Sequence, residues 1–255
     1  YDKEIVMLEF FKPSSSDVRY VQEKQLVISL ICRMDSYKFS HPFAYPNREN
    51  ERIIGMTSYG TARVESNKII IPAGMQLLIK KYLSQRITME DVEFANEFSI
   101  NHFGRPLFKR NAWVRVVNEF NGYLPLVIRS VPEGTPIRGG QPIYTVTCLD
   151  ESFEDNLFWM SAAFETMIQR GVWYPTTIAT NDYNIKKRIK DYYLLSGADL
   201  GMLPFSLHDF GGRGVSSGET AEIGGRVQQP RNFRQPRCRQ QTNRKSESRS
   251  SRQFK

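Results

Sequence analysis

The chain has 255 residues, of which 40% are apolar and 12% aromatic, which is enough to bury a core and argues against a chain that is disordered throughout. Its net charge of +8 belongs to one end, because residues 226–255 hold ten Lys or Arg and one Glu, whereas the rest holds 25 basic and 26 acidic residues. Three widely spaced cysteines and the lack of any long apolar run exclude a disulfide framework, a clustered zinc site and a membrane span, and they fit a cytoplasmic protein.

The first part of the chain predicts an α+β domain over 34–150, after an N-terminal extension, 1–33, of uncertain structure. Residues 35–45 read as a polar and aromatic loop. Four segments rich in β-branched and aromatic residues predict strands: 53–64, 69–71, 126–131 and 143–148. Helices are predicted over 74–83, from a capping box formed by Thr88 and Asp91, and after Asn111.

The pattern changes after residue 150. Apolar residues at helical spacing predict one helix over 157–171 and another over 181–197, followed by a strand over 203–207. Helices that lead into a short strand with a glycine-rich end are typical of an α/β barrel, so 151–225 is predicted to begin one. The fold class expected for the whole chain is α/β. Residues 226–255 are rich in Arg, Gln and Ser and are predicted to be a disordered, basic, low-complexity tail.

The most informative motif follows the predicted strand 203–207. Four glycines between Gly211 and Gly218 let the backbone approach a ligand, and Ser216 with Glu219 forms a capping box that opens a helix. A helix N-terminus favours an anion. Arg213 adds a planar fork that matches phosphate oxygens, and Phe210 offers a flat face for a heteroaromatic ring. This motif predicts a ligand made of a ring and a phosphate.

Several runs together resemble the nicotinamide phosphoribosyltransferase family between Met34 and Gly224. They are Met34–Lys38, 124–134, 173–181 and the run from His208 to Gly224. The resemblance implies condensation of nicotinamide with phosphoribosyl pyrophosphate, which gives nicotinamide mononucleotide and pyrophosphate without a covalent nucleophile from this segment. It also implies a cytoplasmic homodimer, Mg²⁺, and ATP as a facilitating co-substrate.

The resemblance also implies roles for individual residues. Phe210 would stack on nicotinamide, and Arg213 would bind phosphate or pyrophosphate. Tyr37 would cover the other face of the ring from a second subunit, with Asp35 beside it, and Arg63 would lie near the phosphate. Simpler readings remain open: a core Phe210, a surface ion pair for Arg213 and a surface loop tyrosine for Tyr37.

The start of the helix after the glycine turn would supply the rest of the phosphate site, through Gly214, Ser216 and Ser217. His208 and Asp209 are expected to hold the turn by side-chain hydrogen bonds rather than to touch the ligand. No confident catalytic residue and no metal ligand is predicted from these residues.

Three functional hypotheses follow. Because the resemblance stops near Gly224 and the first residue is Tyr, we expect a truncated form of the enzyme, without the barrel half that carries further substrate contacts. The alternative is a non-catalytic truncated or frame-shifted product that at most binds a partner subunit. A further alternative takes the basic tail, 226–255, as a nucleic-acid-binding arm, although its lack of interleaved aromatic residues makes nucleic acid an improbable partner.

Overall fold

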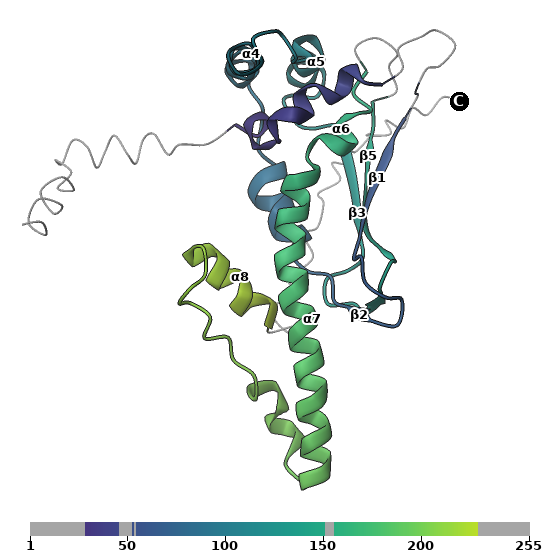
Figure 1. The fold of residues 1–255 in the computed structure, drawn as a ribbon, viewed down its shortest axis with the longest axis vertical. Coiled ribbons are helices and arrows are strands. Elements are labelled where there is room, and N and C mark those ends of the chain that lie inside the picture. Colours follow the sequence, from purple (N-terminus) through teal and green to yellow (C-terminus); the bar gives the residue numbers. More distant parts are fainter. Residues whose placement is uncertain (1–28, 46–52, 54, 151–155, 229–255) are drawn as a thin grey trace, which may run out of the picture.

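The computed structural model describes residues 29–45, 53, 55–150 and 156–228. Within these ranges, helices and two small antiparallel sheets are arranged around one long helix, α7 (Glu165–Ser196) (Figure 1). The predicted mixed class of helices and strands is confirmed. The extension up to residue 28 and the tail from residue 229 lie outside the described residues.

The larger sheet has the order β1-β5-β3, formed by β1 (Thr57–Thr61), β5 (Pro142–Cys148) and β3 (Leu126–Ser130). The central strand β5 buries alternate residues, Tyr144 and Val146, as expected for a sheet with one covered face. A second, two-stranded sheet pairs β2 (Ile69–Ile70) with β4 (Ile137–Arg138). The four predicted strands are therefore present, and β4, which is two residues long, was not predicted.

The first helices also follow the sequence pattern. The segment predicted as a loop contains short 3-10 turns, namely η1 (Ile31–Arg33), η2 (Ser36–Phe39) and η3 (His41–Phe43). Next come α3 (Met75–Leu78), its π-helical continuation η4 (Ile79–Leu83), α4 (Met89–Phe103) and α5 (Arg110–Glu119). The capping box of α4 is confirmed, because the Asp91 N–H donates to the Thr88 hydroxyl at 3.2 Å and the Thr88 N–H donates to the Asp91 carboxylate at 2.8 Å.

The main core forms around Trp113 of α5, which is 1% exposed. Its ring stacks on Phe108 at a centroid distance of 6.0 Å and meets the edges of Trp159 and Phe164 at 5.8 and 6.3 Å. Such aromatic pairs stabilise the packing by about 1 kcal/mol each beyond their area burial. Because Trp159 and Phe164 follow residue 150 in the chain, the segments on both sides of that position share one core.

The two helices predicted over 157–171 and 181–197 are instead a short α6 (Met160–Ala163) and the continuous 32-residue α7. Gly171 and Asn181 read as helix boundaries, yet both lie inside α7, as does Pro175. The helix continues through Gly171, whose missing side chain lets Leu78 pack against α7. A Cβ at this position would lie 2.6 Å from a Leu78 methyl carbon. The predicted end at Gly197 is confirmed, with the left-handed conformation (φ 71°) of a C-terminal glycine.

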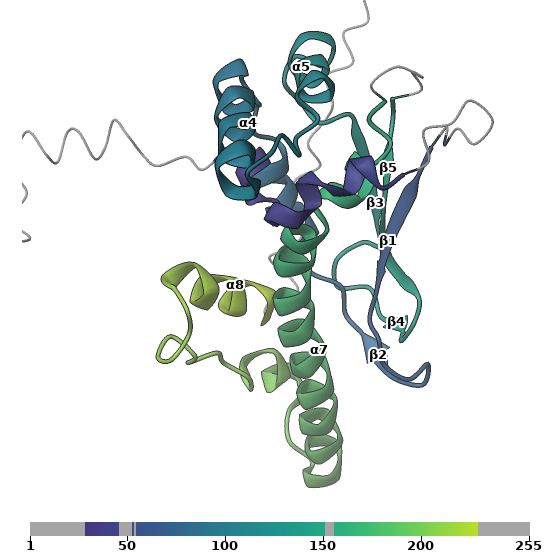
Figure 2. The ribbon, with the colours of Figure 1, turned by 45° about the horizontal axis from the view of Figure 1, so that its top comes forward.

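The predicted strand over 203–207 is wrong. Residues Leu200–Phe205 form a 3-10 helix, η5, which starts where the Asp199 carboxylate accepts the Gly201 N–H at 2.8 Å. Pro204 cannot donate a ladder hydrogen bond, so this segment is poorly suited to a sheet. The chain then turns back and ends its described part with α8 (Gly218–Gln228), which lies on the opposite side of α7 from the strands (Figures 1 and 2).

Candidate functional site

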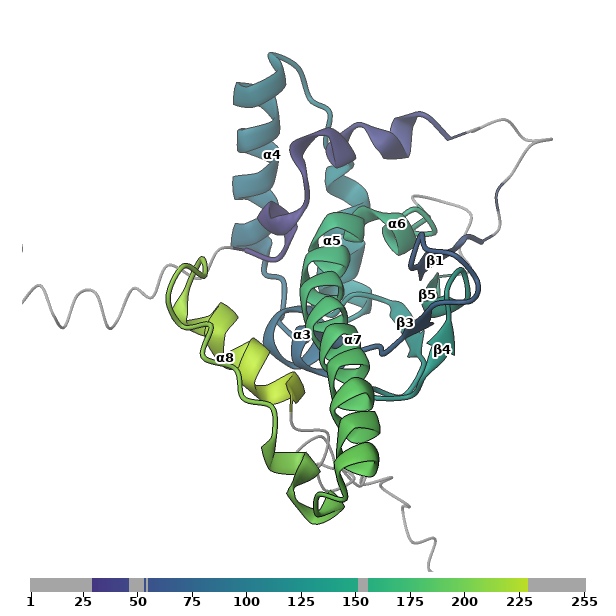
Figure 3. The ribbon, with the colours of Figure 1, turned by 60° about the horizontal axis from the view of Figure 1, so that its bottom comes forward.

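A cavity of about 790 Å³ is lined by residues of α3, α7, α8 and the segment that includes η1. Figure 3 shows how α3, α7 and α8 are arranged around this region. This volume falls within the range of roughly 300 to 1,000 Å³ typical of small-molecule sites. Its polar and charged lining residues are Cys32, Arg33, Asp35, Tyr82, Arg170, Tyr174, Ser216, Glu219 and Thr220. The cavity thus joins the Met34–Lys38 run to the start of α8, two segments that are far apart in the sequence.

The wall between α3 and α7 depends on glycine. Gly74, the residue before α3, has φ 97°, and a Cβ there would lie 2.4 Å from the Gly171 carbonyl oxygen. Pro175, four residues after Gly171, has no N–H to bond that carbonyl. Thr176 and Thr180 lie on the same side of α7, and their hydroxyls accept the backbone N–H groups of Ala73 and Ile71 at 3.1 and 3.0 Å.

The start of α8 differs from the prediction by one residue. Ser217, not Ser216, caps the helix, because its hydroxyl accepts the Thr220 N–H at 3.1 Å. The predicted capping box is therefore wrong. Glu219 does not reach back to the cap, because its carboxylate pairs with Lys81 at 2.5 Å and accepts from the Tyr82 hydroxyl at 3.4 Å. These contacts fix α8 against η4 and explain why the capping role passes to Ser217.

The opposite wall is formed by the Met34–Lys38 run. Asp35 lines the cavity, and its Oδ2 accepts a hydrogen bond from the Thr166 hydroxyl of α7. Lys38 is only 6% exposed and pairs with Glu165 at 2.6 Å. Tyr37 points elsewhere: it is 51% exposed, and its ring lies 5.1 Å from that of His41. The predicted role of Tyr37, covering the nicotinamide ring of a second subunit, stays a prediction.

The structure brings only some of the predicted site residues together. Asp35, Gly214 and Ser216 line the cavity. Phe210 is 89% exposed, so it is not a core residue, and Arg213 is exposed outside the lining of the cavity. The remaining two predicted residues, Ser217 and Arg63, are also exposed and outside the lining, with Arg63 just beyond β1. The binding roles of all of these residues stay predictions.

The turn that carries Phe210 and Arg213 is nevertheless held in place. The Asp209 carboxylate accepts the Gly211 N–H at 2.7 Å, and the Asp209 N–H donates to the Gln228 side chain at 2.7 Å. Gly224 of α8 lies so close that a Cβ there would be 2.4 Å from the Asp209 carboxylate. Asp209 therefore braces the turn against the end of α8, in agreement with the structural role expected for it.

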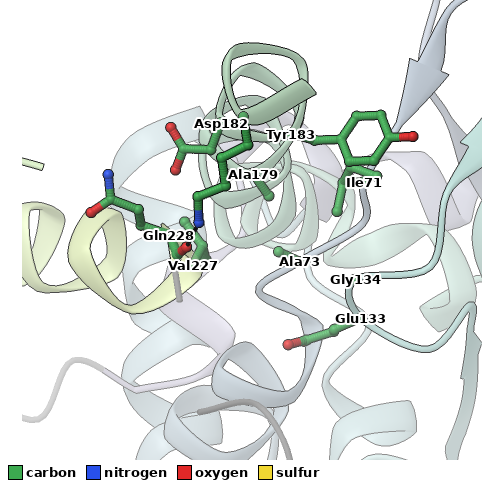
Figure 4. A pocket seen from close by; sticks show the side chains of 10 residues that line it. Ile71, Ala73, Glu133, Gly134, Ala179, Asp182, Tyr183, Val227 and Gln228 are labelled. Carbon is green, nitrogen blue, oxygen red and sulfur yellow. Dashed lines mark hydrogen bonds between the residues drawn. The ribbon is translucent and has the colours of Figure 1, made fainter. Parts of the chain in front are cut away.

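A second cavity of about 350 Å³ lies farther along α7, between the β2 end, the turn at Glu133 and the end of α8 (Figure 4). Asp182 and Glu133 lie at opposite ends of it (Figure 4). The Glu133 carboxylate accepts the Gln76 N–H at 2.9 Å, and the Lys186 ammonium donates to the Gln228 carbonyl at 2.7 Å. It contains none of the predicted site residues.

The sequence reasoning missed Arg33, Arg170 and Tyr82, which line the larger cavity. Arg33 immediately precedes the Met34–Lys38 run, and this position is the one sequence feature that could have indicated it as a site residue. The Cys32 thiol lies there too, and burial, with a smaller effect of the Asp91 charge, raises its pKa. Across the described residues, no group of three or more His, Cys, Asp or Glu side chains is placed to hold a metal ion. Nor is any helix in the described ranges long and apolar enough to cross a membrane.

Comparison with known proteins identifies the class of this chain. Residues 29–128 match the family model described as "Nicotinamide phosphoribosyltransferase, N-terminal domain". Over 198 residues the chain is 34% identical to the nicotinamide phosphoribosyltransferase of Xanthomonas campestris. This alignment covers 77% of this chain and 40% of the relative. A relative of the same name from Mycoplasma genitalium is 24% identical over 73% of this chain and 44% of its own length.

The class is therefore that of the phosphoribosyltransferases. More narrowly, residues 29–128 belong to the nicotinamide phosphoribosyltransferase family as its N-terminal domain, and the resemblance seen in the sequence is confirmed. The chain spans less than half the length of these curated relatives. Among solved structures, that of human nicotinic acid phosphoribosyltransferase aligns with 16% identity and a TM-score of 0.48 over 76% of this chain and 34% of its own.

Proposed function

We propose that this chain is the N-terminal part of a cytoplasmic, homodimeric nicotinamide phosphoribosyltransferase, which condenses nicotinamide with phosphoribosyl pyrophosphate. The observation that carries the proposal is the cavity that joins Asp35 to Gly214 and Ser216. These residues come from two of the runs that resemble the family, and the cavity that they line also includes α7 residues. Because the chain spans less than half of its relatives, the activity of the complete enzyme would also require the residues that this chain lacks.

In the proposed reaction, pyrophosphate leaves the anomeric carbon of the ribose as the pyridine nitrogen attacks it. Arg213 and the N–H groups at the start of α8 would stabilise the charge on the departing diphosphate. Phe210, with its exposed ring, and Tyr37 of a second subunit would hold the pyridine between two faces. These groups act by position and charge, so no covalent intermediate with this chain is needed.

Mg²⁺ is part of the proposal as a cofactor that arrives with the substrate. Magnesium in proteins commonly takes one or two carboxylates together with substrate phosphates. Asp35 is the carboxylate of this cavity whose side chain, among the described residues, is contacted by the Thr166 hydroxyl and by no cation. When bound, Mg²⁺ would neutralise part of the diphosphate charge. ATP is included as a facilitating co-substrate, and we assign no described residue to it.

Calorimetric titration of the 255-residue chain, first with nicotinamide and then with phosphoribosyl pyrophosphate, tests the proposal. We expect Arg213→Met to weaken binding of phosphoribosyl pyrophosphate and Phe210→Ala to weaken binding of nicotinamide, each about tenfold. Arg188→Met changes an exposed arginine of α7 outside both cavities and is the matched control. Absence of heat with both ligands would contradict a binding function for this chain.

A second candidate function, binding of a partner subunit without catalysis, is favoured by a different observation. Apolar side chains are exposed along the distal part of α7 and in η5, namely Tyr192, Leu194, Leu195, Met202 and Phe205. Leu195 is 84% exposed. Contiguous exposed apolar surface commonly marks a protein interface. Sedimentation of the chain over a range of concentrations tests this function, and a monomer at all concentrations that stays monomeric with a full-length relative would contradict it.

A further inference from the structure

Arg33 is a cation of the larger cavity that has no ion-pair partner among the described residues. Its Nε is buried and makes no hydrogen bond within the described part of the chain. The guanidinium lies 4.6 Å from the centre of the Tyr82 ring, a cation–π contact that fixes its plane. Arginine stays protonated at all ordinary pH values. A buried donor on a charged group is costly unless water or a ligand accepts from it, and an anion also offsets the charge.

A second cation reaches the same cavity from α7. Arg170 lines the cavity, and no described carboxylate lies within ion-pair distance of its guanidinium. Arg33 and Arg170 come from different elements, one from η1 and the other from the second turn of α7. Two guanidinium groups that border one cavity can hold an oxyanion from two directions.

The two acidic residues of the cavity contact partners other than these arginines. The Asp35 carboxylate is engaged by the Thr166 hydroxyl. Glu219 is engaged by Lys81 and by the Tyr82 hydroxyl, and these contacts direct it toward η4. The Gly214–Ser216 backbone and the first turn of α8 form the remaining wall. Within the described residues, neither carboxylate forms an ion pair with Arg33 or Arg170, so both cations are available to an anionic ligand.

We propose that this cavity binds a phosphate-class oxyanion through Arg33 and Arg170, at a site separate from Arg213. Arg213 is exposed and does not line the cavity, so an anion held by Arg33 would not occupy the predicted Arg213 site. The inference shares the cavity of the proposed function, which contains Asp35, Gly214 and Ser216, but it requires neither nicotinamide nor the Phe210 turn. The volume of about 790 Å³ accommodates a single phosphate group or a diphosphate.

Calorimetric titration of the full chain with inorganic pyrophosphate, and separately with orthophosphate, tests the site. We expect Arg33→Met to weaken binding at least about tenfold, with partial recovery in Arg33→Lys because a cation is restored. The control Arg188→Met, which changes an exposed arginine outside both cavities, should leave this binding unchanged. Tighter binding of pyrophosphate than of orthophosphate would assign a diphosphate ligand, and equal binding would assign one phosphate group.

Alkylation of Cys32 by iodoacetamide provides a second measurement that locates the anion. Cys32 lines the cavity, whereas the half-buried Cys148 at the end of β5 lies outside it. Pyrophosphate should slow alkylation of Cys32 several-fold and leave Cys148 unaffected, as read by peptide mass spectrometry. Unchanged alkylation of Cys32, or loss of binding in Arg213→Met with none in Arg33→Met, would overturn the inference. If Arg33→Met fails to fold, protection of Cys32 in the unsubstituted chain decides.

Discussion

The hydroxyl of Thr176 makes two hydrogen bonds to the backbone of Ala73: it accepts the N–H at 3.1 Å and donates to the carbonyl oxygen at 3.3 Å. Both residues are buried. One side chain of α7 thus takes the place of a neighbouring strand for the segment that leads from β2 to α3. This contact sets the distance between α7 and the wall of the cavity.

Replacing Thr176 by Val should destabilise the protein by about 1 to 3 kcal/mol, because it keeps the shape and leaves both backbone groups of Ala73 buried without a partner. The control is Thr177→Val, whose hydroxyl only contacts the Trp173 carbonyl on the exposed side of α7. We expect the control to change the free energy of unfolding by less than about 0.5 kcal/mol. Urea unfolding followed by circular dichroism measures both, and equal effects would contradict the role of Thr176.

Gly74→Ala should be more damaging than Gly134→Ala. Both glycines have positive φ, 97° and 82°, so both substitutions carry a backbone cost of about 1 to 2 kcal/mol. A Cβ at Gly134 meets nothing within 4 Å, whereas at Gly74 it collides with the Gly171 carbonyl oxygen. The melting temperatures of the two variants, measured by thermal unfolding, show the additional cost of the collision at Gly74. A lower melting temperature for Gly134→Ala than for Gly74→Ala would refute the close approach of α3 and α7.

Ser217→Ala should destabilise α8, because it removes the acceptor for the Thr220 N–H; caps of this kind contribute about 0.5 to 2 kcal/mol. Ser216→Ala should have a smaller effect, since Ser216 only shares a hydroxyl contact with Thr220. Hydrogen exchange of the first amides of α8 distinguishes the two. Faster exchange in Ser216→Ala alone would restore the capping position expected from the sequence.

Glu133 should make stability depend on pH. Burial raises the pKa of its carboxyl, although hydrogen bonds from the backbone at the start of α3 act in the opposite direction. A carboxyl with a raised pKa in the folded state binds protons more tightly there, so its contribution is fullest below the unfolded value of about 4.3 and is lost as pH rises through the folded pKa.

Glu133→Gln removes this titration and keeps an oxygen for the Gln76 N–H. The unfolding free energy of the unsubstituted chain minus that of the variant should therefore fall as the pH rises from about 4 to about 7. Denaturant unfolding over this range measures the difference. A difference that rises with pH would show that the hydrogen bonds to the carboxylate outweigh its burial.

The sequence predicted most elements of the first half because their signals are local. The Thr88–Asp91 capping box and the apolar face around Trp113 act within one helix, and the strands carry their own β-branched residues. The errors after residue 150 arose where tertiary contacts override local signals. Gly171 and Pro175 look like helix breakers, but packing against Leu78 and Gly74 accommodates both.

The sequence correctly indicated which segments form the candidate site, but it identified only some of the individual residues that line the cavity. It singled out Asp35, Gly214 and Ser216, which share the cavity. Apart from the position of Arg33 beside the Met34–Lys38 run, it could not indicate Arg33 or Arg170, because an arginine that lines a cavity differs from a surface arginine only through its neighbours in space. The choice between Ser216 and Ser217 as helix cap likewise depends on where Lys81 and Tyr82 hold Glu219.

The proline in α7 has a mechanical consequence. Pro175 removes one rung from the backbone ladder of the helix, and it does so beside the cavity, opposite Gly74. Helices bend most readily where a rung is missing. The position at which α7 bends most readily therefore lies beside the cavity formed with η1, α3 and α8. A bend at Pro175 that tilts the C-terminal part of α7 would widen or narrow the space between Arg33 and the first turn of α8.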